Sequence, residues 1–157
     1  MQPLSLIDRE TCHLVVISSD VLELISRYQQ SAPEDCEAGG ILIGVMHGPH
    51  LEITGATEPQ QTDKRSRMRF RRSEAGHQLI LNRRWENSGG TENYVGEWHT
   101  HPERDPQPSS IDLREWSRAS KRLGEPMIVI IGGQISNYYA VVDDRKCRVL
   151  HAISCIP

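Results

Sequence analysis

Short runs of apolar, β-branched residues alternate with helical segments along this chain, without the regular repeat of a parallel α/β protein. This irregular order predicts an α+β fold with a mixed, largely antiparallel sheet flanked by helices. Capping residues and apolar spacing predict three helices, from Ser18–Asp20 to about Tyr28, from Ser73 to Trp85 and from about Ser110 to Leu123. In the second helix, Leu79 and Ile80 are expected to face the sheet. Turn signals between β-branched runs predict strands at 13–17, 41–46, 51–56, 94–101, 127–131, 138–142 and 148–153.

Length and charge limit the classes of protein to consider. The 157 residues are about the size of one domain, so a single domain over residues 1–157 is expected. Hydrophobic residues make up 37% and charged residues 25%, which is typical of a folded domain rather than a disordered chain. The formal net charge of −3 excludes bulk charge as a basis for binding nucleic acid or a membrane, so neither is expected as a partner.

Targeting and cysteine patterns favour the cytoplasm. No window holds the roughly 18 apolar residues that cross a bilayer, and the first residues lack the basic and apolar segments of a secretory signal. The four cysteines are widely scattered and form no C-x-x-C pair: Cys12, Cys36, Cys147 and Cys155. This spacing argues against both a cysteine-rich zinc module and a disulfide scaffold.

His99-Thr100-His101 is the sequence feature with the most chemical content. The two histidines lie on a predicted strand, where side chains two residues apart share a face, and Asp112 follows at the start of the third predicted helix. Two imidazoles and one carboxylate would give three ligands and leave one position open, which is the layout of a catalytic zinc site. Spacing alone leaves two further possibilities open, because the histidines could be ordinary surface residues and Ser109 with Asp112 also fits a helix capping box.

These residues resemble a known motif. His99-Thr100-His101-Pro102, six further residues and then Ser109-x-x-Asp112 match the JAMM signature of the JAB/MPN/Mov34 metalloproteases in residue type and spacing. The upstream segment 37–44, Glu-Ala-Gly-Gly-Ile-Leu-Ile-Gly, is similar to the glutamate and glycine-punctuated strand of that family. The compact length and the segment Glu-Trp-His-Thr-His-Pro at 97–102 are most similar to stand-alone bacterial JAB proteins. Such proteins are encoded beside ubiquitin-activating and ubiquitin-conjugating-like enzymes, including in CBASS antiphage operons. The resemblance implies a single MPN/JAB-like domain.

The resemblance also implies a role for each site residue. His99, His101 and Asp112 would hold one zinc ion per chain, and zinc lowers the pKa of a bound water to about 7. Glu37 would take the proton of that water and pass it to the leaving amine. Ser109 would donate a hydrogen bond to the developing oxyanion.

Members of the family hydrolyse the bond after the C-terminus of ubiquitin or a ubiquitin-like tag. In CBASS systems the tag-like partner is a cGAS/DncV-like nucleotidyltransferase, whose C-terminal tail is conjugated to target proteins and released by the JAB protein. The resemblance therefore implies a zinc-dependent isopeptidase for such a conjugate. The alternatives are a sulfur-carrier-processing JAB hydrolase, a RadC-like protein and a non-catalytic MPN scaffold.

Two features remain open beside this assignment. Glu97 shares a predicted strand face with His99, so local geometry favours it as the base, whereas the family pattern favours Glu37, which is 62 residues away from His99. The run from Lys64 to Arg72 contains six basic residues. It is either a solvated strand face or a patch that steers an acidic partner.

Overall fold

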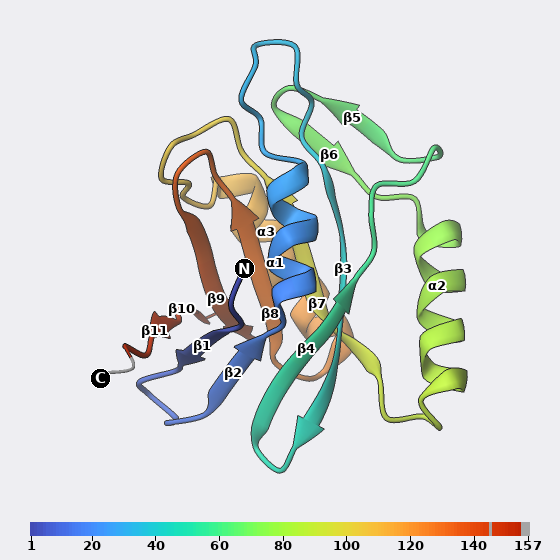
Figure 1. The fold of residues 1–157 in the computed structure, drawn as a ribbon, viewed down its shortest axis with the longest axis vertical. Helices are drawn as coiled ribbons and strands as arrows, with labels where there is room; N and C mark the ends of the chain where they lie inside the picture. Colours follow the sequence, from blue (N-terminus) through green and yellow to red (C-terminus); the bar gives the residue numbers. More distant parts are fainter. Residues whose placement is uncertain (145, 155–157) are drawn as a thin grey trace.

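A curled, mixed sheet forms the centre of the molecule (Figure 1). The structure is a computed structural model that describes residues 1–144 and 146–154. Within these residues, nine strands follow the order β10-β9-β8-β7-β3-β4-β2-β1-β11, and β5 and β6 form a separate hairpin. The strands are β1 (Leu4–Ile7), β2 (Leu14–Ile17), β3 (Gly39–His47), β4 (His50–Ala56), β5 (Lys64–Ser66), β6 (Arg69–Arg71), β7 (Asn93–Thr100), β8 (Met127–Gly132), β9 (Asn137–Asp143), β10 (Lys146–Val149) and β11 (His151–Ala152).

The pairing confirms a mixed sheet, but the sheet is not an open layer flanked by helices. The described pairs are antiparallel except β2–β4 and β7–β8. The two end strands, β10 and β11, are separated in the chain only by Leu150, whose N–H donates to the carbonyl of Tyr139 in β9. The register also shifts in the middle of β3, against both neighbouring strands. Such irregularities increase the local bend, and the sheet consequently curls until it is nearly closed.

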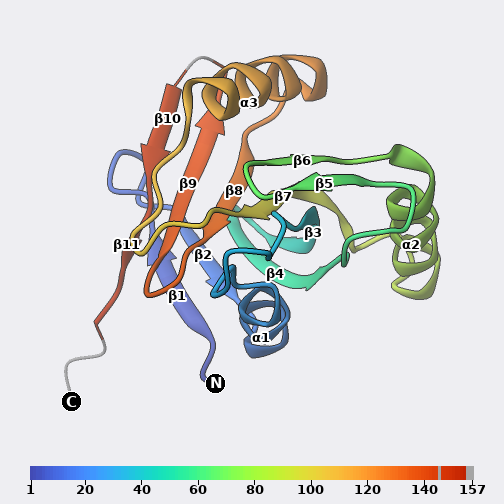
Figure 2. The same cartoon turned by 90° about the horizontal axis from the view of Figure 1, so that it is seen from above.

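Helices cover both faces of this sheet. Helix α1 (Ser19–Arg27) lies on one face and α3 (Ser110–Leu123) on the other (Figure 2), while α2 (Glu74–Asn87) packs beside β3 and β7. Strand β8 is therefore buried on both sides: Ile128 and Ile130 belong to the core under α1, whereas Val129 and Ile131 pack with Trp116 of α3. Among the described residues, none of the helices combines the length and the apolar character needed to cross a membrane.

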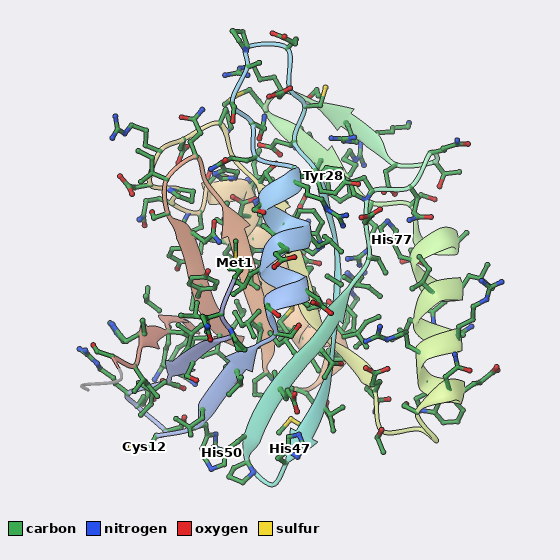
Figure 3. All side chains as sticks on the ribbon, in the orientation of Figure 1. Met1, Cys12, Tyr28, His47, His50 and His77 are labelled. Carbon is green, nitrogen blue, oxygen red and sulfur yellow. The ribbon has the colours of Figure 1, made fainter. Side chains whose placement is uncertain are left out.

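Helix α2 corrects one expectation about the helices. Leu79, which was expected to face the sheet, is 55% exposed, and Ile80 is only half-buried. The residue of α2 that is fully buried is His77, which points toward the sheet (Figure 3). The helix is attached through polar contacts, because the His77 ring bonds the Thr57 hydroxyl (2.6 Å) and the Arg84 guanidinium donates to Glu92. An apolar stripe is therefore not needed to hold α2, and hydrophobic spacing misidentifies its inner face.

The ends of the chain differ from expectation in smaller ways. Strand β1 was not predicted, and the strand predicted at 148–153 is divided into β10 and β11. Cys12, Cys36 and Cys147 are free thiols, and Cys155 lies outside the described residues.

Candidate metal centre

Strand β7 brings the two histidines of the H-x-H motif together. Their Nε2 atoms lie 3.0 Å apart and their ring centroids 4.9 Å apart, on the face of the sheet that α3 covers. Thr100, between them, points to the opposite face, where its hydroxyl accepts from the N–H of Ala38. His101 follows directly after the strand and is held beside β8, because its N–H donates to the carbonyl of Gly132. The shared strand face predicted from the period-two pattern is therefore confirmed.

Asp112 reaches the histidines from the first turn of α3. Its Oδ1 lies 3.3 Å from His99 Nε2, and its Oδ2 lies 3.3 Å from His101 Nε2. The same residue completes a capping box, since Ser109 N–H donates to Asp112 Oδ2 (2.7 Å) and Asp112 N–H donates to Ser109 Oγ (3.1 Å). The capping and metal-site interpretations of this pair are therefore compatible, because the cap fixes the carboxylate in the orientation that faces both rings.

The spacing and chemistry of these side chains fit a tetrahedral metal ion. Bonds of roughly 2.0–2.1 Å to such an ion hold its ligand atoms about 3.3 Å apart. The two Nε2 atoms lie 3.0 Å apart, and each lies 3.3 Å from a different oxygen of the Asp112 carboxylate. With one ligand atom taken from each residue, all three lie within 4.8 Å of one another, so a small adjustment would bring them to that spacing. Two imidazole nitrogens and one carboxylate oxygen are a donor set used by zinc and other divalent transition metals. The residues present could therefore hold such an ion.

The electrostatics keep the carboxylate in its charged form. Burial alone would raise the pKa of Asp112, but hydrogen bonds from His101, His99 and the Ser109 N–H outweigh it and hold this pKa far below its usual range. Burial also acts to lower the pKa of His101, and the adjacent Asp112 carboxylate reverses this effect and raises it. A metal ion binds the ionised carboxylate and neutral imidazoles, so it would replace the proton that Asp112 favours on His101.

Glu37 lies beside this cluster, although it is far from it in the sequence. In the antiparallel pairing of β3 with β7, Gly39 is opposite His99 and the Thr100 N–H donates to the carbonyl of Ala38. Glu37, the residue before Ala38, is thereby placed beside His101. Glu37 is only 5% exposed. Burial raises the pKa of its carboxyl, while the neighbouring imidazoles act in the opposite direction.

Glu97 shares the strand face of His99, as expected, but its ionic partner is Arg72 rather than a histidine. Its Oε2 lies 3.3 Å from Nη1 of Arg72, and its side chain is 24% exposed. The two glutamates therefore differ in environment: Glu97 is in an ion pair at the wall of the site, whereas Glu37 is buried next to the histidines.

These residues line one cleft of about 770 Å³ between α3 and the β5–β6 hairpin. The cleft brings together all five residues that the sequence singled out: Glu37, His99, His101, Ser109 and Asp112. It also contains residues that sequence reasoning missed. Trp116 packs its ring against that of His99, with centroids 5.9 Å apart, and Phe70 occupies the space over Gly39 that any Cβ would fill. In the sequence, the glycine at position 39 was the signal that could have indicated this close packing of Phe70.

The basic run forms the hairpin that makes one wall of this cleft. Some of its side chains are structural anchors: Arg65 Nε donates to the Glu37 carbonyl (2.8 Å), and Arg67 Nη1 donates to the carbonyls of Ala32 and Pro33. The Glu37 N–H donates in turn to the carbonyl of Ser66 (2.7 Å). The hairpin therefore fixes the backbone of Glu37.

Comparison with known proteins agrees with the motif. The family model of prokaryotic homologues of the JAB domain matches residues 8–147. The chain belongs to this family. Among its relatives, a CD-NTase/cGAS isopeptidase of Pseudomonas aeruginosa is 43% identical over 131 residues, 82% of this chain and 83% of that protein. A CD-NTase/cGAS isopeptidase of Escherichia coli is 42% identical over 134 residues, 85% of each chain. The resemblance inferred from the motifs is confirmed, and these relatives indicate a JAB-family hydrolase.

A solved structure supports the fold. The solution structure of protein DSY2949 from Desulfitobacterium hafniense superposes with a TM-score of 0.59 and covers 88% of each chain. At 17% sequence identity, this similarity concerns the fold alone.

Proposed function

We propose that the protein is a zinc-dependent isopeptidase of the JAMM type. It hydrolyses the bond after the C-terminus of a ubiquitin-like or similarly conjugated protein. The observation that supports this most strongly is the convergence of His99, His101 and Asp112, whose ligand atoms lie within 4.8 Å of one another, beside the buried Glu37. A non-catalytic scaffold has no need for this arrangement of ligands and base.

His99, His101 and Asp112 would hold one zinc ion per chain. When bound, zinc polarises a carbonyl and lowers the pKa of water, so that a nucleophile forms at neutral pH. The protein orients its ligands through the capping box on Asp112 and through the packing of Trp116 against His99. Such outer contacts fix ligand geometry and are often as important as the ligands themselves.

Glu37 moves the proton in this proposal. It takes a proton from the attacking water and delivers it to the leaving amine, as a general base and then a general acid. Its burial supports the assignment, because a raised carboxyl pKa brings the group closer to the pH at which it must both accept and donate. Glu97 is then a wall residue, paired with Arg72.

Ser109 stabilises the oxyanion that develops when the carbonyl is attacked. Its Oγ accepts the N–H of Asp112 (3.1 Å), and the hydroxyl hydrogen is therefore available to donate. Its side chain is exposed at the edge of the cleft, where a substrate carbonyl can approach it.

The substrate would be a conjugate of a nucleotidyltransferase tail. The relatives at 43% and 42% identity are described as CD-NTase/cGAS isopeptidases, which supports release of a CD-NTase from its targets in CBASS antiphage defence. Ubiquitin-activating and ubiquitin-conjugating-like enzymes would act in the same pathway. An extended tail with a small last residue fits best, because a bulky side chain would crowd the reacting carbonyl.

The test uses a conjugate of a CD-NTase, the substrate named for the relatives, with a reporter protein, analysed by mass spectrometry with and without a chelator. We expect one cleavage, directly after the last residue of the tail, that stops when the metal is removed. Scattered cleavage, or cleavage that continues in chelator, contradicts the proposal.

A further inference from the structure

The cleft changes its charge along its length. Carboxylates surround the end that holds the histidines: Glu37, Glu103 and Asp112. The side chains that line the cleft farther along α3 and on β6 are basic: Arg71, Arg118, Lys121 and Arg122. A substrate segment lying in this cleft therefore meets two opposite electrostatic environments.

The middle of the cleft is neutral because its charges are paired. Arg69 of the hairpin lies 3.3 Å from Glu115 of α3, and Arg72 lies 3.3 Å from Glu97. The four basic residues of the far end are different. They are exposed, and no ion pair is formed by any of them within residues 1–144 and 146–154. Of the lining carboxylates in the described chain, two also form no ion pair: Glu37 at the histidine end, and Glu74. Unpaired positive charge therefore predominates away from the histidines.

The helical spacing places this charge at a defined distance from the reacting bond. Arg118 and Arg122 are one turn apart and continue the ridge of α3 that begins with Ile111 and Glu115. At about 1.5 Å per helical residue, they lie roughly 9 and 15 Å along the axis from Asp112. An extended chain rises about 3.3 Å per residue, so this distance corresponds to about three to five substrate residues.

We propose that the basic end of the cleft, formed by Arg71, Arg118, Lys121 and Arg122, binds an acidic segment of the substrate. The segment lies about three to five residues from the cleaved bond, and its carboxylates complement the four guanidinium and ammonium groups. This inference rests on the proposed isopeptidase function and names a determinant of substrate choice. Complementary charge of this kind favours selectivity and fast encounter more than tight binding.

Neither helix stabilisation nor nucleic-acid binding accounts for the whole arrangement of these basic residues. Lys121 and Arg122 lie in the last turn of α3, where basic residues stabilise the helix dipole, but this does not explain Arg71 on the opposite wall. Nucleic acid is a poor fit, because carboxylates are interspersed along the cleft and would repel phosphates. Stacking on bases also requires open aromatic faces. Trp98 and Trp116 are each only 1% exposed, and the half-buried Phe70 ring packs over Gly39.

The experiment compares two double variants that change charge equally. Arg118→Glu with Arg122→Glu reverses the basic end, and Arg83→Glu with Arg114→Glu reverses two exposed arginines that lie outside the cleft lining. The probes are fluorescein-labelled twelve-residue peptides with three glutamates, three glutamines or three lysines. Binding is measured by fluorescence anisotropy on the metal-loaded protein with Glu37→Gln, which prevents turnover, at low and at physiological salt.

We expect the glutamate peptide to bind roughly tenfold more tightly than the glutamine peptide at low salt, and the lysine peptide to bind least. The cleft reversal removes this preference, whereas the control reversal leaves it within about twofold. Binding of the three peptides to the protein that keeps Arg118 and Arg122 tests the inference even if the charge-reversed variant fails to fold. Equal binding of the three peptides, or an equal loss in the control, overturns the inference. A single-stranded oligonucleotide that displaces the glutamate peptide at tenfold lower concentration also overturns it and assigns the surface to nucleic acid.

A hydrolysis series separates this inference from the proposed function. Conjugates with the same three charge patterns, three to five residues on either side of the cleaved bond, are given to the protein with its native Glu37. The inference requires kcat/KM to rise with acidic residues on one side. Equal cleavage of all conjugates overturns the inference and leaves the isopeptidase function standing, whereas no cleavage of any conjugate contradicts the function and leaves the charge preference to the binding data.

Discussion

The carboxylate of Asp112 has two sets of partners, and this makes it the most informative residue to change. It caps α3 through the Ser109 N–H and faces both imidazoles at 3.3 Å. Asp112→Asn keeps an oxygen for the cap but removes the charge, and we expect a folded protein that has lost its metal. Ser109→Ala loses the cap acceptor and should destabilise the fold by about 0.5–2 kcal/mol while keeping the metal. Elemental analysis together with thermal unfolding checks both variants, and a full metal complement in Asp112→Asn would contradict the site assignment.

The two glutamates of the cleft give a second prediction at the residue scale. Glu37→Gln removes a base without removing a candidate ligand, so we expect it to retain the metal and to lose roughly 10²–10⁴ in hydrolysis rate. Glu97→Gln breaks only the ion pair with Arg72 and should change the rate far less. Both variants are compared by steady-state hydrolysis of the same conjugate and by metal content. If Glu97→Gln is the inactive one, the assignment of the base is reversed.

At the scale of elements, a buried polar network joins α2 to the sheet and to the base of the hairpin. Asp63 accepts from the N–H of Gln60 (2.6 Å), the N–H of Ser73 (2.7 Å) and His77 Nε2 (2.9 Å). His77 Nδ1 in turn lies 2.6 Å from the hydroxyl of Thr57, which follows β4. Burial alone would raise the pKa of Asp63, but these donors outweigh it and lower the pKa below its usual value.

This network predicts a defined pH dependence of stability. A lowered aspartate pKa stabilises the fold above the unfolded value of about 3.9, and that stabilisation is lost as the pH falls through the folded value. Asp63→Asn should therefore cost about 1–3 kcal/mol at pH 7, and the difference from the parent protein should narrow below about pH 4. Urea unfolding across this pH range measures it, with the exposed Glu86→Gln as a control that stays close to the parent. A cost that is the same at pH 7 and pH 3 would show that the charge of Asp63 is not what stabilises the network.

Helices α3 and α2 show which features of an element the sequence can predict. Helix α3 was predicted over the observed residues, because Ser109 caps it and Gly124 ends it with a left-handed φ of 70°. The inner face of α2 was predicted wrongly, because Leu79 is exposed and the helix is held through His77 and Arg84. Local rules therefore succeed where capping and apolar periodicity determine an element. They fail where long-range polar contacts determine it.

At the scale of the whole molecule, the site combines local and distant information. Asp112 follows His101 by 11 residues, and strand and helix periodicity made the three residues a candidate metal site while leaving the capping interpretation of Asp112 open. The approach of Glu37 depends on the pairing of β3 with β7, which sequence spacing does not reveal. Local geometry favoured Glu97 over Glu37 as the base. Their different environments, Glu37 buried and Glu97 in an ion pair, emerge only from the fold. The nearly closed sheet was likewise beyond local patterns, because it depends on Leu150 bringing the two end strands together.

The last prediction concerns the contribution of the metal to the whole fold. The candidate ligands come from the end of β7, the residue directly after it and the first turn of α3, so a bound ion would link the strand end to the helix. The two apolar cores consist of other residues, so the protein should remain folded without metal. An ion present at 100 times its dissociation constant stabilises the folded state by about 2.7 kcal/mol. For a chain of this size, that corresponds to a change in Tm of roughly 5–10 °C. Thermal unfolding in excess chelator and after zinc is restored should show this shift in the parent protein and none in His101→Ala. An unchanged Tm in the parent, or an equal shift in the variant, would mean that the ion binds elsewhere or does not contribute to the fold.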